Sequence, residues 1–320
     1  MAVKEQIGIA REAQAPGRVR RRKLSREVRN IPLGLLFVAP WVVSFLAFVA
    51  YPLFASFYYS FTFYPILRSP RWVGLRNYGK LLTDRLFKVS VLNTAYYAFF
   101  SVTSGVALSL ALALLMNQHM WLRPFYRGIF YAPTLVPSVA TAILWLWMLD
   151  TRYGLVNMGM RSLGLETIPF FTSIRWAKPS LIFMGWWGLG GRMLIFLAAL
   201  QDVPRSLYEA ASIDGANLWD KGRHITLPLI TPAIFFAVVT GLIGAMQAFT
   251  NVFFTTGGGP ADATLLYGLY LYNTAFEQLF MGYGATLAWV LFVVIMSLTL
   301  LMFRTSKLWV FYAGGARGEG

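Results

Sequence analysis

The chain has 320 residues, of which 57% are hydrophobic and only 13% are charged. A soluble domain usually carries about 25% charged residues, so this composition excludes an ordinary soluble protein and indicates a surface largely covered by lipid. The formal net charge is +15, but the basic residues cluster outside the apolar runs, which favours lipid headgroups over nucleic acid. No cysteine is present, which excludes disulfides, thiolate nucleophiles and cysteine-ligated zinc.

A basic segment comes first. Residues 1–30 contain nine Lys or Arg and three Glu and have little hydrophobicity, which predicts a disordered cytoplasmic tail. The apolar run that follows is too long for the core of a cleaved signal peptide, so we expect a retained first span.

Six apolar runs come next, each able to supply the roughly 20 residues that cross the hydrocarbon core. They predict an all-α integral membrane fold with six transmembrane helices, in a domain over residues 31–304 that a cytoplasmic tail over residues 305–320 follows. Prolines inside the runs are tolerated because neighbouring groups can satisfy the freed carbonyls. The runs are Leu33–Phe63, Val89–Gln118, Gly128–Leu149, Ser180–Leu200, Pro228–Phe254 and Gly284–Phe303.

The distribution of basic residues predicts the orientation. Six spans place both termini on one side, and the tails and loops of that side carry seventeen Lys or Arg, against ten in the opposite loops. This asymmetry favours cytoplasmic N- and C-termini, although the opposite loop 68–88 is itself basic. Aromatic residues of the opposite loops are expected to anchor at the interface or to touch an outer partner; these are Trp72, Tyr78, Trp176, Tyr267, Tyr270 and Tyr272.

Titratable groups are nearly absent from the six runs, which contain only Arg192. A proton relay or a hydrolytic site would need such groups in a protected place, so we predict no enzyme, no metal and no cofactor. His119 and His224 lack metal-ligand spacing. The segment Gly74–Lys80 resembles a phosphate-binding loop, but Leu81 replaces the required Ser or Thr and no βαβ unit surrounds it. Energy for uphill transport must then come from another chain.

The loop 203–228 has the pattern of two short helices around a glycine turn. The first is expected over Leu207–Ile213 and ends at Gly215, which can adopt a positive φ. Asn217 can cap the second helix, and Pro228 is expected to open the fifth span, where its missing N–H costs least. Such an element would lie across the membrane surface, either as a docking site for another protein or as an ordinary interfacial helix.

The residues of this loop also follow a known order. Glu-Ala-Ala at 209–211, Gly215, Ile225 and Leu-Pro at 227–228 have the spacing of the signature loop in permease subunits of binding-protein-dependent ABC importers, and the chain matches it without departure. Over roughly residues 33–312 the chain resembles the carbohydrate-importer branch, the family of the maltose and glycerol-phosphate permeases. The flanking stretches that carry this resemblance are Gly74–Tyr78, Phe196–Gln201, Pro204, Gly257–Pro260 and Trp309.

The resemblance implies a type I ABC importer permease architecture in a bacterial or archaeal cell membrane, with no cofactor. It implies four kinds of partner: a second homologous permease subunit, an ABC ATPase dimer on the cytoplasmic side, an extracytoplasmic substrate-binding protein and membrane lipid, with no nucleic acid. The loop 203–228 would couple the subunit to the ATPase. The residues implied at that contact are Glu209, Ala210, Ala211, Asp214 and Gly215.

The resemblance also implies a substrate path near the bilayer middle, along spans four and five. Gln247 and Asn251 are four residues apart, so one helix would present both on the same face. An aromatic ring beside amides suits a sugar; the alternative is helix packing, with glycines for close approach. The candidates for the path are Trp186, Trp187, Gly188, Gln247 and Asn251.

Arg192 has three interpretations, because a charged residue in a span usually faces a cavity or a partner. It could attract an anionic group such as that of glycerol phosphate, pair across a subunit interface, or snorkel toward the membrane surface. We favour pairing or snorkelling. The leading hypothesis is therefore a sugar permease, with glycerol-phosphate import as the alternative. A membrane-embedded enzyme and a passive channel, which would need no docking loop, are less well supported.

Overall fold

The computed structural model describes residues 36–118 and 121–311. The basic tail expected over 1–30, His119 and the last part of the expected C-terminal tail lie outside this range. The chain divides into two units, one up to Tyr58 and one from Tyr59 onward.

The first described element is an apolar helix from Leu36 to Ser60, 25 residues long. It contains the π-helical turn η1 (Leu46–Ala50) and ends with α2 (Tyr51–Ser60). It is long and apolar enough to cross a membrane.

Four helices in the described part of the chain are long and apolar enough to cross a membrane, and two bent pairs raise the possible number of spans to six. The long helices are Leu36–Ser60, Arg85–Asn117, Leu218–Met246 and Met281–Ser306. The expectation of an all-α membrane fold is confirmed. The only strands among the described residues form a short antiparallel hairpin, β1 (Thr62–Phe63) with β2 (Arg71–Trp72), in which Thr62 pairs with Trp72.

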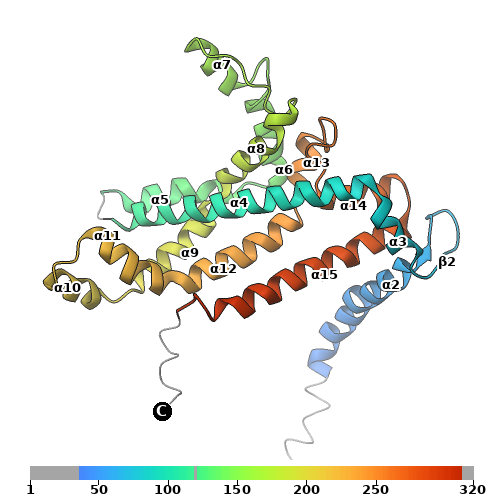
Figure 1. Ribbon diagram of the computed structural model, residues 1–320, viewed down its shortest axis with the longest axis horizontal. Coiled ribbons are helices and arrows are strands. Elements are labelled where there is room, and N and C mark those ends of the chain that lie inside the picture. The colour runs from blue at the N-terminus through green and yellow to red at the C-terminus, as the bar shows by residue number, and fades with distance from the viewer. Residues whose placement is uncertain (1–35, 119–120, 312–320) are drawn as a thin grey trace, which may run out of the picture. The chain divides into compact units, whose positions relative to one another are not determined.

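The core of the second unit is built by the long helices. As Figure 1 shows, α4 (Arg85–Asn117) lies beside α12 (Leu227–Met246), which in turn packs on α15 (Met281–Ser306); α9 (Gly190–Gln201) also packs on α4. One apolar cluster joins α4, α9 and α12 around the fully buried Phe196, and a second lies around Leu287. At one end of these helices lie α10 (Arg205–Ile213) and α11 (Leu218–Lys221), and at the other α3 (Arg76–Thr83) and α14 (Tyr267–Tyr272).

The third and fourth apolar runs are bent rather than straight. α5 (Arg123–Tyr131) with the 3-10 turn η2 (Ala132–Leu135) meets α6 (Ser138–Met148) at 99°, and α8 (Ile174–Gly185) with η3 (Trp186–Gly188) meets α9 at 53°. The first bend lies at Pro133 and Pro137, which lack the N–H that would continue a helix. The turns η2 and η3 contact each other, so the two bends come together.

The fifth run is interrupted near its end. α12 ends at Met246, Gln247–Phe249 are not helical, and α13 (Thr250–Thr255) then packs on α6. The expectation that Gln247 and Asn251 share the face of one helix is therefore wrong. Instead of continuing α12, the chain forms α13, which packs on α6. This contact joins residues far apart in the chain, so the local sequence does not reveal it.

The connections far from α10 contain further short helices. The connection after α6 contains α7 (Leu155–Ser162), and α14 continues into the π-helical turn η5 (Asn273–Glu277). Tyr267 and Tyr270 of α14 are 4% and 5% exposed, so the expectation that they anchor the chain at the interface is wrong. Each buried hydroxyl has an acceptor: Tyr267 donates to the Leu287 carbonyl over 2.8 Å, and Tyr270 donates to Asp84 over 2.5 Å.

Asp84 joins three helices at this end. Its Oδ1 accepts the N–H of Phe87 over 3.1 Å and so caps α4, while its Oδ2 accepts the hydroxyls of Tyr270 over 2.5 Å and of Tyr283, the third residue of α15, over 2.6 Å. Burial alone would raise the pKa of Asp84, but these hydrogen bonds outweigh burial and leave the pKa below its ordinary value. The folded chain therefore stabilises the carboxylate form.

Asp84→Asn should lower the unfolding temperature of the detergent-solubilised protein at neutral pH. Asn caps a helix as well as Asp does, but its NH₂ cannot accept the two hydroxyls, at a cost of roughly 1–3 kcal/mol. Because the folded pKa is depressed, the carboxylate contribution is complete above the unfolded pKa, near 4, and is lost as the pH falls through the folded value. The difference in unfolding temperature between the wild type and Asp84→Asn should therefore become smaller below about pH 4. A difference that does not change with pH would contradict this account.

Gly190→Ala should destabilise the fold. A Cβ at this position would lie 2.1 Å from the carbonyl oxygen of Phe130, which is backbone and cannot move aside cheaply. Such overpacking costs roughly 1–3 kcal/mol. Gly191→Ala is the matched control, because no atom lies within 4 Å of its Cβ position. Thermal unfolding followed by size-exclusion chromatography should separate the two variants, and equal stability would show that α9 does not approach α5 this closely.

Candidate functional site

The loop between α9 and α12 forms the helix, turn and helix expected from the sequence. α10 ends in a Schellman motif: Ala216 donates to the Ala211 carbonyl over 2.9 Å, and Gly215 donates to that of Ser212 over 3.2 Å. Gly215 has φ +79°, a region that glycine enters without steric cost. The expected glycine turn is confirmed.

Asn217 starts the next helix with a capping box. Its Oδ1 accepts the N–H groups of Trp219 and Asp220 over 2.9 and 3.0 Å, and the Asp220 carboxylate accepts the Asn217 N–H. The expected cap is confirmed, and Pro228 is the second residue of α12 as expected, but no helix end separates α12 from the preceding turns. The helix runs without interruption from Leu218 to Met246.

A π-helical turn explains how this helix passes Pro228. In η4 (Gly222–Thr226) the N–H of Leu227 donates to the Gly222 carbonyl, five residues earlier. Pro228 has no N–H to donate to the carbonyl four residues before it. The widened turn lies directly before the proline, so the helix continues where the sequence alone indicated a start.

Two side-chain contacts hold the two halves of the loop together. The Tyr208 hydroxyl and Thr226 Oγ1 are 2.9 Å apart, and Lys221 Nζ donates to Ser212 Oγ over 2.7 Å. α10 is therefore attached to the beginning of the long helix by side-chain contacts as well as by the turn. We expect α10, the turn and the start of the long helix to move together.

The loop is accessible on the side of its turn. Glu209, Ala210, Asp214 and Gly215 are exposed and Ala211 is partly buried. The Glu209 carboxylate has no hydrogen-bond or ion-pair partner among residues 36–118 and 121–311.

Large apolar side chains beside the turn were missed by the sequence reasoning. Ile213 and Leu218 are both 88% exposed, and Trp219 is 75% exposed. Their position in an otherwise polar loop is a signal that could have identified them, because apolar groups of this size beside a turn are typical of contact surfaces. Behind them, a cavity of about 770 Å³ separates the loop from the ends of α4 and α9.

The path candidates lie at the breaks of the helices. Trp186, Trp187 and Gly188 make up η3, while Gln247 directly follows the last residue of α12 and Asn251 is the second residue of α13. Trp186 Nε1 donates to Ser104 Oγ of α4 over 2.9 Å, and the ring of Trp187 packs edge-on against Trp145 of α6.

The amides and the tryptophans are not joined directly. No hydrogen bond links Gln247 or Asn251 to η3 within the described chain, although α6 contacts both α13 and the ring of Trp187. Gln247 is exposed, and the buried Oδ1 of Asn251 has no hydrogen-bond partner. An unpaired buried acceptor is costly, and the Asn251 Oδ1 is enclosed by the chain in this structure.

Arg192 lies between three helices. It belongs to α9, and its guanidinium occupies space left by two glycines: a Cβ on Gly105 of α4 would lie 2.5 Å from Nη1, and one on Gly241 of α12 would lie 3.4 Å from Nη2. No carboxylate pairs with it in the part of the chain that the structure describes. Pairing across a subunit interface stays a prediction.

Within residues 36–118 and 121–311, no three His, Cys, Asp or Glu side chains gather closely enough to hold a metal ion.

The fold and the loop define a multi-span transport subunit, and comparison with known proteins gives the family. Residues 105–307 match the model of the binding-protein-dependent transport system inner membrane component. The chain belongs to this family: it is the permease subunit of an ABC importer, a membrane transport component and not an enzyme.

Individual relatives agree along nearly the whole length. The chain is 38% identical to the probable ABC transporter permease protein YesP of Bacillus subtilis (strain 168), covering 91% of this chain and 96% of that protein. It is 32% identical to the trehalose/maltose transport system permease protein MalF of Thermococcus litoralis, covering 87% and 95%.

A solved structure confirms the fold. A chain of a bacterial ABC transporter involved in the import of the acidic polysaccharide alginate superposes with a TM-score of 0.79 at 23% identity, covering 89% of this chain and 98% of that one. The expected type I importer permease architecture is thereby confirmed.

Proposed function

We propose that the chain forms part of the membrane path for a sugar and that the loop 203–228 receives the work of a separate ATPase. The observation that carries the coupling role is the exposed turn at Gly215, which presents the signature residues at the end of a helix fixed to the fifth span. The six apolar runs of the sequence contain no Asp, Glu, His or Lys that could couple transport to proton movement.

The loop surface supports docking of a protein. Two acidic side chains, Glu209 and Asp214, are exposed beside the apolar side chains of Ile213 and Leu218. A complementary partner would present a cleft lined by apolar and basic groups. We expect an ATPase subunit on the cytoplasmic face to provide this cleft. The termini are then cytoplasmic, and the remaining partners are a second permease subunit and an extracytoplasmic substrate-binding protein.

The sugar assignment rests on relatives and on chemistry. A relative with 32% identity is named for trehalose and maltose transport. In this chain partly exposed tryptophan rings lie at one helix break, and amides lie at another. Aromatic faces stack on the C–H faces of sugars, while amides hydrogen-bond hydroxyls.

Glycerol-phosphate import remains the second candidate, with Arg192 as its support. Its guanidinium is the one cation within the six apolar runs of the sequence, and it has no carboxylate partner among the described residues. Binding of sn-glycerol 3-phosphate and of a panel of mono- and oligosaccharides to the reconstituted importer separates the two. If the phosphate ester is transported and no sugar is, and if Arg192→Gln abolishes that transport, the sugar proposal fails.

Gly215→Asp should uncouple ATP hydrolysis from uptake while leaving the chain in the membrane. The variant places a charged side chain in the turn that faces the ATPase. No atom of the chain lies within 4 Å of its Cβ position, so the new side chain meets no clash, although the positive φ strains any side chain placed there. Gly215→Asn is the matched control. Asp and Asn both tolerate a positive φ and have nearly the same size, but only Asp is charged.

The measurement is substrate uptake and ATPase activity of the same proteoliposomes. We expect uptake to fall at least about tenfold in Gly215→Asp, the equivalent of one lost contact of about 1.4 kcal/mol, and to fall less in Gly215→Asn. Full uptake in the aspartate variant would count heavily against docking at this turn.

Asn251→Ala should raise the sugar concentration needed for half-maximal uptake by roughly fivefold to tenfold, the value of one neutral hydrogen bond. Gln247→Ala should act in the same direction. Gln278→Ala is the control, because it removes an exposed amide from the connection after α14. An unchanged concentration dependence in both path variants would show that these amides only support helix packing.

A further inference from the structure

The basic loop 68–88 lies where a membrane protein usually has few positive charges. It carries six Lys or Arg and lies at the end of the long helices opposite to α10 (Figure 1). Positive charge on the side away from the cytoplasm opposes the usual bias, and of the six only Arg85 pairs with a carboxylate among the described residues, that of Asp262.

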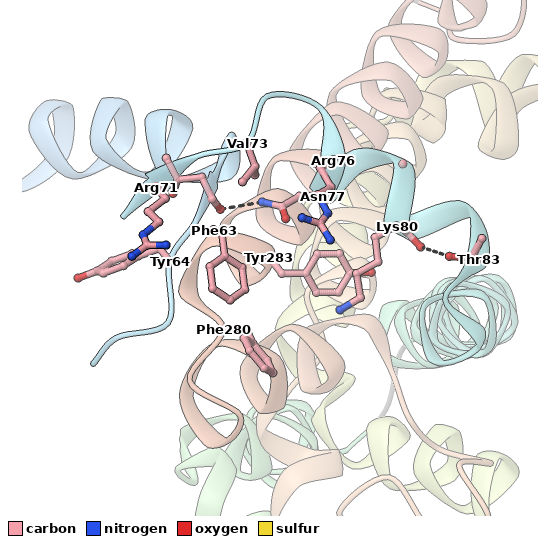
Figure 2. Close-up of a pocket in the computed structure, with 12 residues that line it drawn as sticks. Phe63, Tyr64, Arg71, Val73, Arg76, Asn77, Lys80, Thr83, Phe280 and Tyr283 are labelled. Carbon is pink, nitrogen blue, oxygen red and sulfur yellow. Dashed lines mark hydrogen bonds between the residues drawn. The ribbon is translucent and has the colours of Figure 1, made fainter. Parts of the chain in front are cut away.

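Three of the six line one cavity of about 820 Å³. Figure 2 shows Arg71 contributed by β2, Arg76 and Lys80 by α3, and two aromatic side chains, Phe280 and Tyr283, by the start of α15. Lys80 Nζ is 4.3 Å from the centre of the Tyr283 ring. A cation above an aromatic face is oriented without being neutralised.

The positive charge of the cavity is not balanced by the chain. Arg71, Arg76 and Lys80 are exposed, and none has a carboxylate partner within the described residues. No acidic side chain lines the cavity. The acid one turn beyond Lys80 is Asp84, whose Oδ2 already accepts two tyrosine hydroxyls.

The walls of the cavity are fixed. The buried amide of Asn77 donates to the carbonyls of Ser60 and Thr62 over 3.0 and 2.8 Å, which joins α3 to β1. On the opposite wall, a Cβ at Gly282 would lie 2.1 Å from the Thr62 carbonyl oxygen, so β1 and α15 are in close contact. The basic groups therefore surround a preformed space.

The surroundings are apolar on the side of the hairpin. Between β1 and β2, Leu67 is 85% exposed and Ile66 is 44% exposed, and Phe63 is exposed beside the cavity. The cavity also lies at the first turn of α15, a helix of membrane-spanning length. Exposed apolar groups next to basic groups at the end of a span are typical of the depth of the lipid headgroups.

We propose that this cavity binds the headgroup of an anionic phospholipid, with the phosphate between Arg71, Arg76 and Lys80. The guanidinium groups can bind phosphate oxygens in pairs, and the exposed apolar side chains of the hairpin cover the beginning of the acyl chains. A free phosphate ion would leave most of the volume and the whole apolar side unused. A lipid ligand would thus account for three of the six basic residues of the loop 68–88, while Arg85 pairs with Asp262.

The test is native mass spectrometry of the complete importer, with dioleoyl phosphatidylglycerol as probe and dioleoyl phosphatidylcholine as the neutral lipid. The triple variant Arg71→Gln, Arg76→Gln, Lys80→Gln should bind phosphatidylglycerol more weakly by roughly fivefold for each charge, about a hundredfold in all. The control variant Lys88→Gln, Arg152→Gln, Arg175→Gln removes three exposed charges from the same end and should retain the lipid.

A second pair of variants tests the charge effect without removing any side chain from the cavity, so that a folding defect does not explain a difference between them. Gly79 lines the cavity and has no atom within 4 Å of its Cβ position. Gly79→Glu adds a competing carboxylate, and Gly79→Gln adds the same bulk without the charge. Only Gly79→Glu should lose phosphatidylglycerol, by at least about fivefold.

Four results would overturn the proposal. They are equal binding of phosphatidylcholine, equal loss in the two Gly79 variants, undiminished binding in the triple variant, and displacement of the lipid by inorganic phosphate at the same concentration. If the triple variant keeps the lipid but no longer binds the substrate-binding protein, the cavity is instead a protein contact and the lipid assignment fails.

Discussion

The carboxylate of Asp84 is the contact on which one end of the helix bundle depends. It caps α4, the longest helix, and accepts one hydroxyl from α14 and one from α15. Hydrogen bonds to a charged acceptor are about twice as strong as neutral ones. The lipid-facing helices offer no hydrophobic driving force for packing in a membrane. A polar junction at their ends therefore fixes where α3 and the hairpin lie, and with them the basic cavity.

The other end of the bundle is organised by continuity of the backbone rather than by charge. Asn217 begins a helix that passes Pro228 through a π-helical turn and ends at Met246, directly before Gln247. The surface proposed for docking and one of the proposed path residues therefore lie next to the two ends of the same helix. The bends at η2 and η3 are the complementary feature, because they place broken backbone and aromatic rings together inside the spans.

The sequence predicted the number of apolar runs, the glycine turn and the cap at Asn217, because periodicity and capping depend on neighbouring residues. It did not predict that the third and fourth runs bend or that the fifth ends before Asn251, since these depend on contacts such as that between α13 and α6. Tyr270 appeared to be an interface residue because its partner, Asp84, lies 186 positions away. Arg192 was found from its charge, but the two glycines that surround it belong to other helices.

The unbroken helix from Leu218 to Met246 has a mechanical consequence. Its 29 residues span roughly 44 Å at 1.5 Å per residue, so a tilt of about 5° would move one end by about 4 Å relative to the other. Because α10 is fixed to the beginning of this helix, a force applied to α10 would tilt the whole helix. The far end of the helix, inside the bilayer, would then move farther than α10 does. A small rotation of the helix at the loop surface would therefore move Gln247 by a few ångströms. A shift of that size is enough to break a hydrogen bond between its amide and a sugar hydroxyl.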